Sequence, residues 1–239
     1  MSQTPPVRRL PVLGIDSPFP PANLAWGDNE PIPGLLCAGA DLSVERLVAA
    51  YSQGIFPWYS EGEPILWWSP DPRMVLEVTD FKVHRSLKQA IKRFQSTPSS
   101  ATLMDTAFSE IIAHCAQSAR AGQDGTWIVP AMQAAYIRLH DAGFAHSIET
   151  WLNGKLVGGL YFTQVGNAVF GESMFALQTD ASKIALAALV DWCKERDITW
   201  IDCQQQTKHL ASLGAKPISR QAFIHKLLTA GTSTPTELQ

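Results

Sequence analysis

The chain has 239 residues, of which 46% are hydrophobic, and a formal net charge of −3 at pH 7. This length and apolar content allow one large domain or two unequal ones around a hydrophobic core. The slightly acidic total argues against a protein that binds nucleic acid through its overall charge. The first residues lack a hydrophobic signal segment and no apolar run has the length of a membrane span, so we expect a cytoplasmic protein without membrane contact.

The N-terminal part predicts a small domain. Residues 1–34 are rich in proline and glycine and indicate extended or looped chain. A helix is predicted at 41–51, with Asp41 or Ser43 as its cap and Gly54 after its end. Two prolines then flank Asp71, a pattern that neither a helix nor a central strand accommodates. We therefore place a domain boundary here, between domains at 1–71 and 72–239.

A basic segment follows a short strand predicted at 73–78. Residues 81–95 contain five lysines and arginines and no acid, although the chain as a whole is acidic. The segment predicts an amphipathic helix, with apolar side chains on one face and basic ones opposite. Lys88, Lys92 and Arg93 are then either an ordinary solvated face or a local stripe that binds phosphate groups.

The remaining elements define the fold class. Helices are predicted at 105–119 and 130–141, and Pro130 suits the first position of the second one. Strands at 146–151, 155–163 and 168–172 are joined by the hairpin signals Asn153-Gly154 and Gly166-Asn167. A helix from about 180 to 196, a strand at 198–204 and a last helix near Ser219 complete the chain. This order predicts an α+β protein with an antiparallel meander.

Polar residues end two of these strands. The apolar strand at 198–204 finishes with Asp202 and Gln204, which strand alternation places on the same face. Glu172 ends another strand, and strand ends that converge on one edge would bring it to the same cleft. Two carboxylates suit acid–base hydrolysis. The amide of Gln204 argues against this, because it is better suited to binding an amine or an oxyanion.

Other chemistries have weaker support. Four scattered cysteines, without paired spacing or a histidine cluster, predict free thiols and no metal site. The sequence also lacks the glycine-rich phosphate loops and the nucleophile-elbow motif of common enzyme classes.

Short segments along the chain resemble one family. In chain order they are GIFPW at 54–58, ILWWSPDPR at 65–73, GTWI at 125–128, HSIE at 146–149, GESMF at 171–175, ASK at 181–183, IDCQ at 201–204 and HLASLGA at 209–215. Together they closely resemble bacterial leucyl/phenylalanyl-tRNA–protein transferases, over roughly residues 18 to 228. The segments are weak signals one by one and specific in this order.

The resemblance implies a fold and a reaction. It implies a C-terminal domain like the N-acetyltransferase (GNAT) fold, without the pyrophosphate loop that acyl-CoA would need, and no cofactor. The reaction moves Leu, Phe or Met from an aminoacyl-tRNA to the N-terminal α-amine of proteins that begin with Arg or Lys, which marks them for degradation by the N-end rule pathway. We expect a monomer.

The resemblance also implies roles for single residues. Gln204 contacts the attacking amine, Asp202 orients or polarises Gln204, and Glu172 holds the cationic N-terminus of the acceptor. Lys88, Lys92 and Arg93 match the family's tRNA-contact patch. The apolar pocket for the transferred side chain would use Trp58 and Trp127, with walls that are equally well explained as plain core: Leu160, Val169, Met174, Leu186 and Ile201.

Two alternatives stay open. A non-catalytic RNA-binding or adaptor protein would use the basic stripe and the tryptophans but has no need for Asp202 beside Gln204. A CoA-dependent acyltransferase needs a glycine-rich pyrophosphate loop, and the sequence before Ala181 lacks one.

Overall fold

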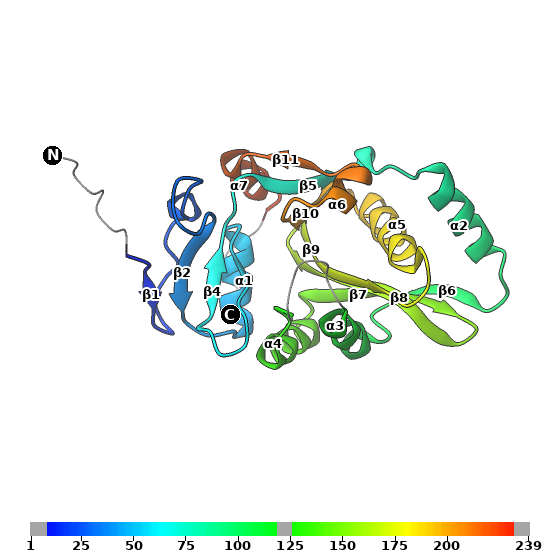
Figure 1. Ribbon diagram of the computed structural model, residues 1–239, viewed down its shortest axis with the longest axis horizontal. Helices are drawn as coiled ribbons and strands as arrows, with labels where there is room; N and C mark the ends of the chain where they lie inside the picture. The colour runs from blue at the N-terminus through cyan, green and yellow to red at the C-terminus, as the bar shows by residue number, and fades with distance from the viewer. Residues whose placement is uncertain (1–8, 119–125, 232–239) are drawn as a thin grey trace.

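The computed structural model describes residues 9–118 and 126–231, which form two β-sheets with helices packed around them (Figure 1). The smaller sheet has four strands in the order β1 (Val12–Leu13), β2 (Leu35–Gly39), β4 (Leu66–Trp68) and β3 (Phe56–Pro57). A 3₁₀ turn at Ala22–Leu24 precedes β2, and helix α1 (Val44–Ser52) connects β2 to β3. Ser43 caps α1, because its side chain accepts a hydrogen bond from the backbone N–H of Arg46.

The larger sheet has seven strands. Their order is β11 (Lys216–Ile218), β5 (Arg73–Glu77), β10 (Trp200–Gln204), β9 (Ala168–Ala176), β8 (Lys155–Val165), β7 (Ala145–Leu152) and β6 (Ser100–Met104). Strands β9 and β10 pair in parallel, whereas every other neighbouring pair in this sheet is antiparallel. The parallel pair lies near the middle of the sheet, where the candidate site is found.

Helices cover both faces of the larger sheet (Figure 1). Helices α3 (Phe108–Gln117) and α4 (Pro130–Asp141) lie on one face, and α5 (Ala181–Lys194) lies on the other with α2 (Arg85–Gln95) beside it. A 3₁₀ turn (Val78–Asp80) precedes α2, and the short α6 (Lys208–Ser212) follows β10. The apolar residues form two cores, one shared by the smaller sheet, α1, α3 and α4, and a second between the larger sheet and α5.

The last helix joins the two parts of the chain. Helix α7 (Arg220–Thr229) packs against the end of α1, where a Cβ on Gly54 would lie 2.8 Å from the side chain of Ile224. The backbone N–H of Arg220 donates to the side chain of Asp71, 3.0 Å away. The chain passes from the smaller to the larger sheet between β4 and β5, and the domain boundary at residue 71 stays a prediction.

The predicted α+β class is confirmed, and α4 has the predicted bounds. Seven of the strands and helices were not predicted: β1, β2, β3, β4, β6, α6 and β11. Strand β6 escaped prediction because it is a half-exposed edge strand without a clear alternation of buried and exposed residues. Strand β10 begins at Trp200 and not at Ile198, because the Ile198 N–H still bonds to the carbonyl of Cys193 in α5.

Candidate active site

A pocket of about 700 Å³ opens where the two parallel strands separate. Strands β9 and β10 are paired at Val169 with Ile201 and at Phe170 with Asp202, and beyond these positions they diverge. Residues 171–174 of β9, residues 203–204 of β10 and the following Gln205 therefore line a gap in the sheet. A gap of this kind exposes strand backbone and side chains that a continuous sheet would bury.

Gln204 has an unusual backbone at this gap. Its φ is +58°, and the register between β10 and β5 shifts between Asp202 and Gln204. Asp202 accepts a hydrogen bond from the backbone N–H of Gln204 at 2.8 Å, which holds this irregular turn. The prediction that simple alternation places both side chains on one face is therefore wrong. Gln204 lines the pocket and Asp202 does not.

Asp202 instead faces Arg73 of β5. The guanidinium donates from Nε to Oδ1 at 2.9 Å and from Nη2 to Oδ2 at 2.6 Å, and both side chains are fully buried. Arg73 also donates to the carbonyl of Gly54 and lies over the rings of Phe56 and Phe223. The buried carboxylate thus has a charged partner, and its hydrogen bond near the pocket is the one it accepts from the backbone of Gln204.

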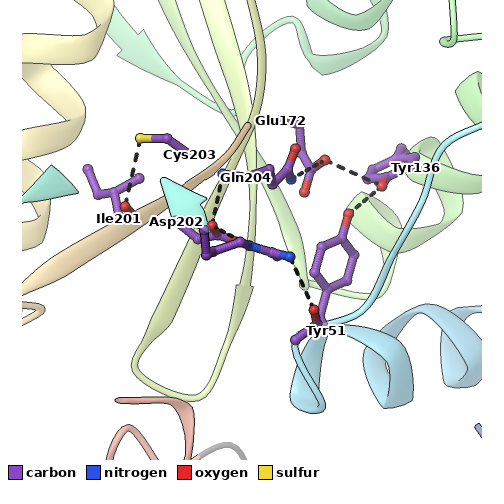
Figure 2. Close-up of polar contacts among 9 residues, drawn as sticks. Tyr51, Tyr136, Glu172, Ile201, Asp202, Cys203 and Gln204 are labelled. Atoms are coloured by element: carbon purple, nitrogen blue, oxygen red, sulfur yellow. Dashed lines mark hydrogen bonds and ion pairs between the residues drawn. The ribbon is translucent and has the colours of Figure 1, made fainter. Parts of the chain in front are cut away.

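Glu172 is the acid of the pocket. Its Oε2 accepts from Nε2 of Gln204 at 3.2 Å and from the hydroxyl of Tyr136 at 3.5 Å. The hydroxyl of Tyr51 on α1 is hydrogen-bonded to that of Tyr136 on α4. Figure 2 shows the two tyrosines and Gln204 converging on Glu172. Helices from both parts of the chain therefore hold this carboxyl group in place.

Burial raises the pKa of Glu172 to about 7, and the charge of Asp202 adds to this, although hydrogen bonds such as that from Gln204 act in the opposite direction. Glu172 is therefore able to bind or release a proton near neutral pH. Burial also raises the pKa of the nearby Cys203 thiol, assisted by Asp202, far above its ordinary value. Cys203 therefore stays protonated and is unsuited to act as a nucleophile.

The rest of the pocket is mostly apolar. Of the residues predicted from the sequence to hold an apolar side chain, Trp58, Trp127, Leu160, Met174, Leu186 and Ile201 line it. Val169 does not: it is fully buried in the core between the sheet and α5, so its prediction as a pocket wall is wrong. Further lining residues are Phe56, Pro57, Tyr161, Gly171, Ser173, Leu189, Cys203, Gln205, Thr207, His209 and Leu210.

Lys88, Lys92 and Arg93 lie apart from the pocket. They are exposed on α2, at the end of the larger sheet beside β6 (Figure 1). None of the ion pairs found among the described residues involves them. The structure thus presents them together on one solvent-facing surface.

Residues 9–118 and 126–231 contain no group of three His, Cys, Asp or Glu arranged to hold a metal ion. Within the same ranges no helix is long and apolar enough to cross a membrane. The fold and the site define an α+β protein with a mostly apolar pocket that ends in a carboxyl group and an amide. This arrangement suits an apolar group next to an amine or ammonium.

Comparison with known proteins narrows this class to one family. A family model described as leucyl/phenylalanyl-tRNA protein transferase matches residues 75–228, and the model of that family's N-terminal domain matches residues 40–71. The chain belongs to this family. A leucyl/phenylalanyl-tRNA–protein transferase of Leptothrix cholodnii is 59% identical over 90% of this chain and 84% of its own length. One of Albidiferax ferrireducens is 58% identical over 96% and 89%.

Similarity to solved structures is more distant. FemX matches with a TM-score of 0.45 and 10% identity, over 76% of this chain and 70% of FemX. A GCN5-related N-acetyltransferase from Kribbella flavida matches with a TM-score of 0.37 and 10% identity, over 72% of this chain and 59% of that protein.

Three residues of the site have no role that the sequence alone predicts. In the sequence, Arg73 is notable only as the last residue of the motif ILWWSPDPR, and Tyr51 and Tyr136 resemble ordinary helix residues. Arg73 has one usable signal, since a buried carboxylate at position 202 requires a partner. The tyrosines have none, because their helices meet only through the tertiary fold.

Proposed function

We propose that this protein transfers Leu, Phe or Met from an aminoacyl-tRNA to the N-terminal α-amine of proteins that begin with Arg or Lys. The main support for the proposal is the pocket, whose apolar walls lie next to the hydrogen-bonded side chains of Glu172 and Gln204. An apolar side chain and a cationic amine fit such a pocket side by side. Membership of the leucyl/phenylalanyl-tRNA–protein transferase family supports the donor and the reaction.

The reaction forms one bond and breaks another. The neutral α-amine attacks the ester carbonyl, a C–N bond forms, and the C–O bond to the ribose breaks, so that the ribose oxygen leaves with a proton. Because the ester is already activated, the enzyme mainly has to position the amine and the carbonyl. An α-amine with a pKa near 8 is partly neutral at pH 7, but most of it must lose a proton first.

Glu172 and Gln204 receive these roles by their contacts. As a carboxylate, Glu172 attracts the cationic N-terminus of the acceptor. With a pKa of about 7 it also accepts a proton from the ammonium. Gln204 gives its Nε2 hydrogen to Glu172, so its carbonyl oxygen is the atom that accepts a hydrogen bond from the attacking amine. Asp202 and Arg73 are positioning residues that fix the backbone of Gln204.

The donor is held at two places. The apolar side chain of the transferred residue lies against Trp58, Trp127 and the aliphatic walls. Lys88, Lys92 and Arg93 bind phosphates of the tRNA from α2. We propose a cytoplasmic monomer whose product is recognised by the N-end rule degradation pathway.

A direct transfer assay tests the proposal. Purified protein is mixed with Leu-tRNA or Phe-tRNA and a peptide that begins with Arg, and the peptide mass is followed. We expect a gain of one Leu or Phe residue, and no gain when the peptide is N-acetylated. Intact ester in the presence of the free peptide would contradict the proposal and favour an adaptor, whereas turnover of acetyl-CoA would favour a CoA-dependent acyltransferase.

A further inference from the structure

A second groove of about 830 Å³ adjoins the pocket. It lies between β4 with the loop that precedes it (residues 58–68) on one side and helices α3 and α4 on the other. Trp58 and Trp127 line both the groove and the pocket, so an extended molecule that starts at Glu172 reaches the groove by passing these two indoles. The proposed reaction assigns no ligand to this groove.

The groove combines an apolar floor with an acidic edge. Trp68, Leu66 and Ile128 contribute apolar surface, and Glu61 and Glu63 are exposed at its edge. Glu63 accepts a hydrogen bond from the backbone N–H of Ser60 at 2.8 Å and makes no ion pair with the described residues. The described residues that line the groove include no lysine and no arginine.

The charges around the groove distinguish between the two macromolecular substrates, the tRNA and the acceptor polypeptide. A phosphodiester chain is bound through lysine and arginine and is repelled by carboxylates. The basic side chains that we assign to tRNA lie on α2, beside β6, at the opposite end of the larger sheet from the smaller sheet that forms the groove (Figure 1). The described residues of the groove are therefore better suited to a polypeptide than to RNA. Its apolar surface suits side chains, and its acidic edge suits cations.

We infer that this groove binds the acceptor polypeptide just after its N-terminal residue, in an extended conformation, and that Glu61 and Glu63 favour basic side chains there. The inference rests on the proposed function, which puts the acceptor's α-amine at Glu172. At about 3.3 Å per residue, an extended segment of about four residues spans roughly 13 Å. The protein would then select an acceptor by the residues that follow the N-terminal residue as well as by the N-terminal residue itself.

The test measures peptide binding without any aminoacyl-tRNA. Two dye-labelled peptides begin with Arg and continue with either lysines or glutamates, and their Kd values are measured by fluorescence anisotropy. We expect the lysine peptide to bind more tightly to the wild type. The double variant Glu61→Gln/Glu63→Gln should weaken its binding about two- to thirtyfold, the range for two exposed ion pairs. The same variant should bind the glutamate peptide unchanged or more tightly.

The chain offers a matched control. Glu45→Gln/Asp141→Asn removes two acids outside the groove, and both peptides should bind this variant as they bind the wild type. Weaker binding of the lysine peptide to both double variants would show a general effect of net charge and would overturn the inference.

Ile32 provides a second test, because it lines the groove and is 44% exposed, so substitution does not disturb the core. Ile32→Lys should weaken binding of the lysine peptide, and Ile32→Glu should strengthen it. If the lysine peptide bound Ile32→Lys and Ile32→Glu with the same Kd, the inference would be overturned. Tighter tRNA binding by Ile32→Lys, with unchanged peptide binding, would assign the groove to RNA and overturn it as well.

The transfer assay separates this inference from the proposed function. Absence of transfer to any Arg-peptide would contradict the proposed function. Transfer whose KM for the lysine peptide is the same in the wild type and in Glu61→Gln/Glu63→Gln would contradict the groove assignment alone.

Discussion

Arg73 and Asp202 are 129 residues apart in the sequence and form a fully buried, doubly hydrogen-bonded ion pair behind the pocket. The pair connects β5 to β10, and through Oδ1 of Asp202 it fixes the backbone N–H of Gln204. Both oxygens of this carboxylate are thus engaged within the protein, and neither lines the pocket. In the proposed function Asp202 therefore positions Gln204 and does not transfer a proton.

The first prediction separates these two roles of Asp202. Asp202→Ala should abolish most transfer and destabilise the fold by about 3 to 5 kcal/mol, because it leaves the Arg73 charge buried and unpaired. Asp202→Asn keeps an oxygen that can accept from the Gln204 N–H, so more transfer should remain. The measurements are urea unfolding and kcat on the folded fraction. Equal kcat values for the two variants, both far below wild type, would contradict the positioning role and indicate that the charge itself is required.

The second prediction concerns the side chain of Gln204. Gln204→Ala should lower kcat about 10²- to 10³-fold, the usual effect of removing one polar group that acts in the transition state. Since the Asp202 bond is to the backbone, the fold and tRNA binding should be unaffected. The exposed amide Gln178, outside the pocket, provides the control variant Gln178→Ala. A wild-type kcat in Gln204→Ala would remove Gln204 from the mechanism.

The third prediction uses the pKa of Glu172. The carboxylate is the active form, so transfer should decrease as the pH falls below about 7, and Glu172→Gln should lose that titration along with most activity. A pH profile of kcat/KM between about pH 5.5 and 9 covers the titration on both sides. An unchanged inflection near pH 7 in Glu172→Gln would assign it to another group.

The same pKa predicts how stability changes with pH. The folded-state value of about 7 lies above the ordinary 4.5, so the folded protein favours protonated Glu172. This favourable contribution is complete below about pH 4.5 and is lost as the pH rises through 7. Glu172→Gln stays neutral, so its stability relative to wild type should rise by up to about 3 kcal/mol between pH 4.5 and 8. Urea unfolding at the two pH values measures the difference, and a relative stability that is independent of pH would contradict it.

The fourth prediction tests the basic surface of α2. Lys92→Gln/Arg93→Gln should weaken tRNA binding and reduce the slope of log K against log salt by about 1 for each phosphate that the variant no longer neutralises. Arg9→Gln/Lys226→Gln removes the same charge from positions outside α2, one before β1 and one on α7, and should leave the slope unchanged. Equal slopes for the two double variants would place the tRNA elsewhere.

The sequence was sufficient for the features that depend on local order. Helix α4 has a proline at its first position, and the hairpins after β7 and β8 have Asn-Gly and Gly-Asn turns, so their positions could be predicted. The polar end of β10 was also visible, because a carboxylate and an amide at the end of an apolar strand stand out. These signals lie within a few residues of the feature that they predict.

The sequence was insufficient where distant segments meet. Gln204 leaves the face of Asp202 because its φ is positive and the register shifts, and strand alternation contains no information about such an irregularity. Val169 resembles a pocket wall because it is apolar and lies in β9, but the pocket begins beyond the paired part of the strand. The partners of Asp202 and Glu172 come from β5, α1 and α4, which only the tertiary fold brings together.

The last prediction concerns Gly214, in the turn between α6 and β11. Its φ is +109°, and a Cβ at this position would lie 2.1 Å from the carbonyl oxygen of Asp80. Gly143 has φ +81°, but a Cβ there would meet nothing within 4 Å. Gly143→Ala should therefore cost only the left-handed backbone conformation, about 1 to 2 kcal/mol. Gly214→Ala should cost clearly more in urea unfolding, because the turn must also move away from Asp80. Equal losses of stability would mean that the turn shifts freely, and that Gly214 is needed only for its backbone angle.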